Sequence, residues 1–106
     1  MPRDVQAELA RARELYYKGI KGDKNALRES DRLFARLHSA APDRPVVQAY
    51  YGSLRLLEAG RTWALWRKNA LSREGLQHLD QAVERSPGDL EVRFLRAATT
   101  YHLPGF

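Results

Sequence analysis

The chain has 106 residues, of which 43% are hydrophobic and 29% are charged, a balance that predicts a folded domain and excludes a disordered chain. The net charge of +5 comes from 18 basic and 13 acidic residues. Because the two signs are interleaved along the chain, they favour solvated helix faces over a dedicated nucleic-acid surface. The lack of cysteine excludes disulfides, thiolate metal sites and cysteine nucleophiles.

Apolar residues recur at steps of three and four along the chain, which is the spacing of one helix face. The first such run is Val5, Leu9, Ala12, Tyr16 and Ile20. No segment of useful length alternates with the period of two that is typical of strands. Segments rich in glycine, proline and capping residues separate the runs. The sequence therefore predicts an all-α protein, a single domain over residues 1–106, with about five helices at 4–19, 24–40, 45–59, 62–86 and 89–102.

Two stretches of the chain share a physical pattern when Pro42 is aligned with Pro87. Each has a helix that ends near the proline, a short turn, and a second helix with aromatic residues and one small residue. In the first stretch the small residue is Gly52. A glycine inside a helix costs about 1 kcal/mol relative to alanine, so it indicates a position that a neighbouring helix approaches closely.

On these residues the chain resembles the tetratricopeptide repeats. AYYGSLRLLEAG is similar to the first helix of such a repeat, with Gly52 at the small-residue position. LQHLDQAVERSPGD is similar to the second helix, through Leu79, Ala82 and Pro87. The resemblance implies antiparallel helix pairs stacked as a short right-handed solenoid of about two and a half repeats. It also implies a non-catalytic module for protein–protein interaction or assembly.

The resemblance further implies a concave groove, lined by the first helices of successive repeats, that takes an extended peptide or a partner helix. The matching wall positions here are Ala10, Glu14, Ala49, Ser53, Leu56 and Arg93. Few of these residues are charged, so the groove suits an apolar or mixed peptide. The lysine–asparagine clamp, with which one branch of the family grips C-terminal carboxylates, is not present at these positions.

The last predicted helix lacks a partner helix, since only HLPGF follows Tyr101. Phe94, Leu95 and Tyr101 should therefore leave apolar surface uncovered. A tail that folds back, a second copy of the chain, or a longer array of which this is a fragment would each cover it. We expect self-association, as a homodimer through this helix.

The two tryptophans lie close together at the start of the fourth predicted helix. An unbroken helix over 62–86 would place Trp63 and Trp66 opposite the face that carries Leu65, Leu76 and Leu79. One interpretation packs the indoles onto the preceding helix as core. A second leaves them at least half exposed, as an anchor for a partner or a second subunit. A third breaks the helix near residues 69–72.

In the exposed case, the residues that would form a partner-binding or self-association patch are Trp63, Trp66, Arg61, Arg67, Lys68, Phe94 and Tyr101. The alternative function uses the same region as a basic module for nucleic acid or an anionic surface. It would be carried by Arg61, Arg67, Lys68 and Arg73 beside the two indoles, because base stacking and positive charge together suit single strands. The interleaved charges make this partner class the less favoured one.

Catalysis is not expected. His38, His78 and His102 lie on different predicted helices without metal-ligand spacing, and neither a phosphate-binding loop nor a nucleophile elbow is found. We therefore expect neither an enzyme nor a cofactor nor a metal site. The early residues are charged from Arg3 onward, and no run approaches the roughly 18 apolar residues that cross a bilayer. This pattern predicts a soluble, cytoplasmic protein without a membrane span.

Overall fold

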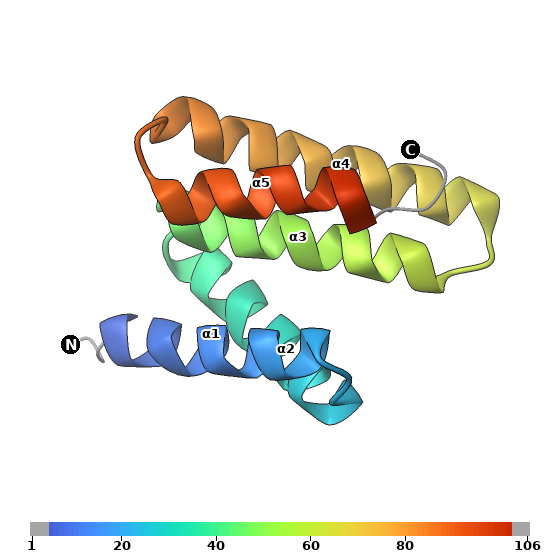
Figure 1. Cartoon of the computed structure of the whole chain (residues 1–106), viewed down its shortest axis with the longest axis horizontal. Helices are drawn as coiled ribbons and strands as arrows, with labels where there is room; N and C mark the ends of the chain where they lie inside the picture. The colour runs from blue at the N-terminus through green and yellow to red at the C-terminus, as the bar shows by residue number, and fades with distance from the viewer. Residues whose placement is uncertain (1–4, 103–106) are drawn as a thin grey trace. The chain divides into compact units, whose positions relative to one another are not determined.

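The computed structural model describes residues 5–102, without the side chains of residues 100–102. This range contains no strand and five helices: α1 (Val5–Ile20), α2 (Lys24–Ala40), α3 (Pro45–Arg61), α4 (Leu65–Arg85) and α5 (Leu90–His102) (Figure 1). The all-α class predicted from the apolar spacing is confirmed. The helix ends differ by at most three residues from the predicted ones, and the largest difference is the start of α4 at Leu65 instead of residue 62.

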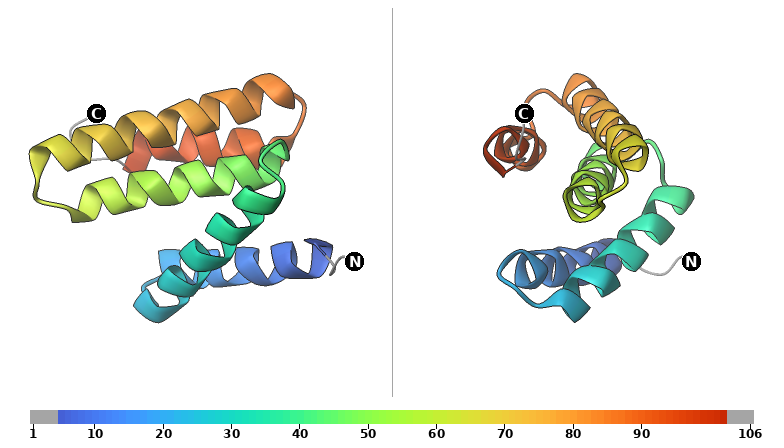
Figure 2. Two further views of the ribbon diagram at one scale, coloured as in Figure 1. Left: turned by 180° about the vertical axis from the view of Figure 1, so that it is seen from behind. Right: turned by 90° about the vertical axis from the view of Figure 1, so that its right-hand side faces the viewer.

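The helices gather into two compact units, Met1–Pro42 with α1 and α2, and Asp43–Phe106 with α3, α4 and α5. Helix α1 packs on α2, α3 packs on α4, and α5 packs on both members of the α3–α4 pair (Figure 2). Packed helix pairs are therefore present in each unit. The single domain expected from the length of the chain stays a prediction.

The first unit is a helical hairpin whose helices are in close contact near their connection. A Cβ atom on Gly19 would lie only 2.6 Å from the Cβ atom of Leu27, so only glycine allows this approach. Further along, the Ser30 hydroxyl donates a hydrogen bond of 3.2 Å to the carbonyl oxygen of Ala12. Ser30 is fully buried, and the bond satisfies a hydroxyl that water does not reach. Phe34, also fully buried, fills the core of this unit.

Polar and glycine chemistry closes this first hairpin. Gly22 has a φ of +126°, and the N–H groups of Gly22 and Asp23 donate to the carbonyl oxygens of Gly19 (3.0 Å) and Lys18 (3.1 Å). These two bonds end α1 in a Schellman motif, which needs a left-handed residue and so favours glycine. The Asp23 carboxylate then accepts the N–H of Ala26 at 3.0 Å and caps the start of α2.

In the second unit, α3 and α4 cross where Gly52 faces Gly75. A Cβ atom on either glycine would lie 2.7 Å from the carbonyl oxygen of the other, so the backbones are in direct contact. The close approach predicted at Gly52 is thus confirmed. Leu79 and Leu56 flank the crossing and are almost completely buried.

One face of α5 covers the α3–α4 pair. Val92 and Leu95 are buried on this face. The hydroxyl of Tyr50 on α3, itself fully buried, donates a hydrogen bond of 2.5 Å to Oε2 of Glu91. The Asp89 carboxylate accepts the N–H groups of Glu91 (2.9 Å) and Val92 (3.2 Å) and so satisfies the first turn of α5. These contacts fix the helix and decide which of its sides faces outward.

Candidate functional site

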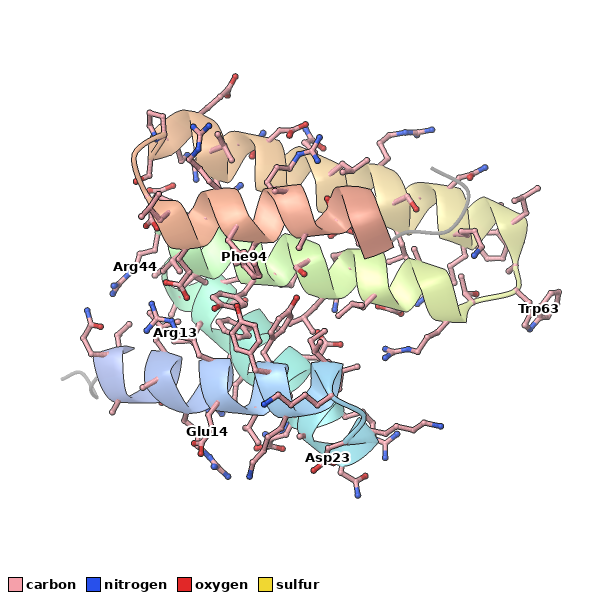
Figure 3. All side chains as sticks on the ribbon, viewed as in Figure 1. Arg13, Glu14, Asp23, Arg44, Trp63 and Phe94 are labelled. Carbon is pink, nitrogen blue, oxygen red and sulfur yellow. The ribbon has the colours of Figure 1, made fainter. Side chains whose placement is uncertain are left out.

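The connection between α3 and α4 carries the largest exposed apolar side chains of the second unit. Trp63 is 94% exposed, Trp66 75% and Leu65 67%. Figure 3 shows Trp63 at the end of the α3–α4 hairpin, pointing away from both helices. We refer to residues 61–68 as the hairpin tip. The three apolar side chains of the tip contribute little to the core, so folding does not explain them.

The turn between α3 and α4 is also weakly stabilised by hydrogen bonds. Three non-helical residues separate the helices, and α4 begins after Ala64, whose side chain cannot accept a hydrogen bond from the first helical turn. Two long bonds of 3.4 Å lie within the turn, from the Thr62 N–H to the Ala59 carbonyl and from the Ala64 N–H to the Thr62 hydroxyl, and the Ala64 carbonyl accepts the Lys68 N–H at 2.9 Å where α4 begins. The tip therefore lacks the side-chain cap that Asp23 gives to α2 and Asp89 gives to α5, and in this respect it resembles the start of α3 at Arg44.

Basic side chains surround the indoles. The segment 59–73 contains four basic residues and no acidic one. Arg67 is paired with Glu58 at 2.6 Å, and Glu58 also lies 3.7 Å from Arg55. Arg61 and Lys68 form no ion pair within the part of the chain that the structure describes. The tip therefore keeps a positive charge next to its apolar side chains.

Of the three interpretations of the tryptophans, the structure favours the exposed one. Helix α4 is continuous from Leu65 to Arg85, so it does not break near residues 69–72. The spacing places Leu65 on the buried face of an unbroken helix, and this expectation is wrong. Leu65 is exposed because α4 starts at this residue, beyond the part of the helix that α3 covers, where burial begins only at Leu71.

The predicted patch of tryptophans, basic residues, Phe94 and Tyr101 is divided in space. Figure 3 shows Trp63 at the end of the hairpin and Phe94 on α5, well away from it. Tyr101 lies in α5, and its side chain is outside the described residues. The structure thus separates the hairpin tip from a second surface on α5.

The outer face of α5 is this second surface. Leu90 is 81% exposed, Phe94 57%, and Ala97 is also exposed, at spacings of four and three residues. Leu95, expected to leave apolar surface uncovered, is instead 1% exposed and belongs to the inner face. Leu90 was not part of the predicted patch, although its spacing to Phe94 and Ala97 is a signal that could have identified it.

A shallow hollow of about 280 Å³ adjoins this outer face, lined by Val83 of α4 and by Arg93, Arg96 and Ala97 of α5. The guanidinium of Arg96 is held by Asp80 at 2.6 Å, and Arg93 donates to the Pro87 carbonyl at 3.1 Å. The hollow is therefore lined mainly by apolar surface, and the two arginines beside it are each held by a polar contact.

The six groove positions fall in both units. Ala10 and Glu14 of the first unit are exposed, and Glu14 lies 3.7 Å from Arg11. In the second unit Arg93 is exposed, whereas Ala49 (0%), Ser53 (5%) and Leu56 (1%) are buried, so these three side chains contribute to packing and not to an open wall. The groove stays a prediction.

A polar network lies between α3 and α4, at the end of the pair opposite the tip. The side chain of Gln48 is only 2% exposed, and its Nε2 atom lies 3.2 Å from Nδ1 of His78 and donates a hydrogen bond of 2.8 Å to Oε1 of Gln81. Its Oε1 atom accepts a hydrogen bond of 2.9 Å from Arg85. Burial lowers the pKa of His78, an effect that nearby Arg55 and Arg85 reinforce and Glu74 opposes. This network satisfies a buried amide, and it marks His78 as a packing residue.

Among the described residues, no group of three or more histidine, cysteine, aspartate or glutamate side chains could hold a metal ion. Within the same range, no helix combines the length and the apolar character required to span a membrane. Comparison of the chain with protein-family models, curated proteins and solved structures found no match.

Proposed function

We propose that the chain is a non-catalytic helical module for protein–protein interaction or assembly, with its helix pairs arranged as a tetratricopeptide-like right-handed solenoid. The observation that carries this proposal is the outer face of α5, where Leu90 and Phe94 are 81% and 57% exposed. Packed helix pairs and the glycine crossing of α3 with α4 support the tetratricopeptide-like arrangement.

Exposed apolar residues are common singly on protein surfaces. Leu90, Phe94 and Ala97 instead follow the i, i+4, i+7 spacing with which one helix contacts another. Helices α1 to α4 each have a hairpin partner, whereas α5 packs on the α3–α4 pair and has no hairpin partner of its own within the described residues. The stripe therefore suits another helix.

The helix that we expect on this face is α5 of a second copy. Identical stripes can cover each other across a twofold axis, which is the commonest symmetry of soluble oligomers. The hollow beside Ala97 gives a large side chain of the second copy, such as Phe94, a place to enter. Capture of an apolar partner helix by the same face is the other form that the interaction can take.

Light scattering coupled to size exclusion, at tens of micromolar protein, tests the proposal. We expect a dimer for the unaltered chain and a monomer for Phe94→Glu, because a carboxylate cannot be buried without a partner. Gln77→Glu is the matched control, since Gln77 is exposed on α4 and off the stripe. If the unaltered chain is a monomer, self-association is wrong and capture of an apolar partner helix is the remaining form of the proposal. An apolar helix should then bind the unaltered chain and fail to bind Phe94→Glu.

A further inference from the structure

The hairpin tip has three features that the interaction proposed for the α5 face does not use. Its two indoles and one leucine are exposed, its charge is positive, and it lies at the end of a helical hairpin (Figures 1 and 3). Trp63, Leu65 and Trp66 fall within four consecutive residues, so all three exposed side chains lie at the end of the hairpin. Any partner of the tip must therefore accept a narrow, projecting end.

Such an end is a poor match for a folded protein. A stable protein–protein interface buries about 800 Å² on each partner, from some 20–30 residues. The tip offers three large apolar side chains and a few cations. A fluid surface that adapts its shape to the protein has no such requirement, since each side chain inserts independently.

The exposed side chain of Leu65 favours a lipid bilayer over a nucleic acid as the partner of the tip. Bases stack on aromatic and guanidinium planes, so Trp63 and Trp66 alone would serve single-stranded binding. An aliphatic side chain that is 67% exposed between two indoles has no use in stacking. In a bilayer, leucine enters the boundary between headgroups and acyl chains, and indoles favour the headgroup level.

Charge complementarity selects the kind of bilayer. The segment 59–73 has four basic residues and no acidic one, and Arg61 and Lys68 have no ion-pair partner within the described part of the chain. Lys and Arg side chains near an anionic membrane surface attract its lipid headgroups, and their long stems let the charge reach phosphate level.

From these observations we propose that the hairpin tip is an interfacial anchor that inserts Trp63, Leu65 and Trp66 into the headgroup region of an anionic bilayer, while Arg61 and Lys68 contact lipid phosphates. The tip docks the second unit on the membrane surface without spanning it. The α5 face plays no part in this docking, so the anchor is independent of the interaction proposed above.

The chain reports on this site by itself, since its only two tryptophans are both at the tip. Vesicles of phosphatidylglycerol and phosphatidylcholine should shift their fluorescence emission to shorter wavelengths, and vesicles of phosphatidylcholine alone should shift it much less. Flotation of the full chain with the same vesicles gives an independent measure of binding. The absence of both a shift and flotation with anionic vesicles would overturn the proposal.

Variants divide the contributions of the tip. Leu65→Ser keeps both indoles and should weaken partitioning, whereas Trp63→Ser with Trp66→Ser should weaken it by about tenfold or more in flotation. Arg61→Gln with Lys68→Gln should cost roughly fivefold per charge. Gln77→Ser, at an exposed position of α4 outside both the hairpin tip and the α5 face, is the control that should retain vesicle binding, provided that helical circular dichroism is unchanged in every variant.

Two results would replace the proposal with a different one. Vesicle binding that survives the double tryptophan change would show attraction of the net positive chain without insertion. Tight binding of an oligothymidine strand that requires both tryptophans and is indifferent to Leu65→Ser would assign the tip to single-stranded nucleic acid instead.

Discussion

The two helical hairpins of this chain are closed by connections of opposite character. Between α1 and α2, Gly22 and Asp23 end one helix and cap the next with hydrogen bonds of 3.0–3.1 Å. Between α3 and α4, Ala64 occupies the capping position without a side-chain bond, and Trp63 beside it is 94% exposed. Both hairpins nevertheless rely on a glycine where their helices meet, Gly19 in the first and Gly52 in the second.

This contrast separates what folding requires from what it does not. In both hairpins the helices come so close together that a glycine is required at the contact, and in this feature the two hairpins are alike. A turn needs a cap, worth about 1 kcal/mol, and only the first hairpin has one. Because the second turn gives up this stabilisation and exposes indoles instead, its residues are available for contact with another molecule.

The shared feature gives the largest expected effect. Gly52→Ala would place a Cβ atom 2.7 Å from the Gly75 carbonyl oxygen, and Gly19→Ala would place one 2.6 Å from Leu27. Since backbone must move in each case, we expect each change to lower the free energy of unfolding by about 2–3 kcal/mol, in its own unit. Hydrogen exchange followed helix by helix measures the two units separately.

Gly60→Ala is the matched control for these changes. Gly60 lies in α3, and a Cβ atom there would meet nothing within 4 Å. This change should leave stability equal or raise it by up to about 1 kcal/mol, because alanine favours helix more than glycine does. An equal loss at Gly52 and Gly60 would mean that helix propensity, and not the crossing, decides the result.

The α3–α4 contact also contains a histidine whose pKa the fold changes. Burial lowers the pKa of His78 below its ordinary 6.5, so the folded state binds its proton less readily than the unfolded state. The contribution of neutral His78 to the free energy of unfolding is therefore fully present above pH 6.5, and it is lost as the pH falls from 6.5 towards the lowered pKa. The slope stays below about 1.4 kcal/mol per pH unit, the limit for one proton.

Hydrogen exchange of α3 and α4, followed at several pH values, measures this slope in the second unit. His78→Gln keeps a polar side chain beside Gln48 and cannot titrate, so it should flatten the curve between pH 7 and 5.5. If the slope is the same with and without the histidine, other groups account for it and His78 is not the sensor.

Local patterns predict the helices well because periodicity and capping act within a few residues. The glycine crossing at Gly52 is also predictable, since an unfavourable helix residue in a strong apolar pattern needs a packing reason. The position of the capping aspartates Asp23 and Asp89 follows from the same local chemistry.

The candidate surfaces are harder to predict because exposure depends on what lies opposite. Helical periodicity gives the direction of Trp66 but not whether another helix covers that side. For Leu65 the periodicity gives the helix face but not its exposure, since α3 does not cover the first turn of α4. Burial of Ala49 and Leu56 follows from packing of α4 and α5 on α3, a tertiary fact that a resemblance to a family does not supply.

The contrast between the turns can be tested by exchanging their caps. Asp23→Ala removes the bond to the Ala26 N–H and should cost about 1 kcal/mol in the first unit. Ala64→Asp supplies the missing cap at the start of α4 and should stabilise the second unit by roughly 0.5–1 kcal/mol. Thermal unfolding with exchange measurements on each unit gives both values. A loss of stability in Ala64→Asp would mean that the turn geometry does not admit a cap.

The smallest expected effect is the one that bears most directly on the tip. Trp63→Ser and Trp66→Ser remove large side chains, yet these are 94% and 75% exposed, so each should change the free energy of unfolding by no more than about 0.5 kcal/mol. Circular dichroism melts measure this, with Leu79→Ala as the contrast, since Leu79 is fully buried and its truncation should cost about 2–5 kcal/mol. A cost near that of Leu79→Ala would show that the indoles stabilise the fold and are not held free for a partner. An unchanged melting temperature together with lost vesicle binding would show that the two indoles contact lipid and do not stabilise the fold. Because folding does not depend on them, the loss of binding could not be explained by unfolding of the chain.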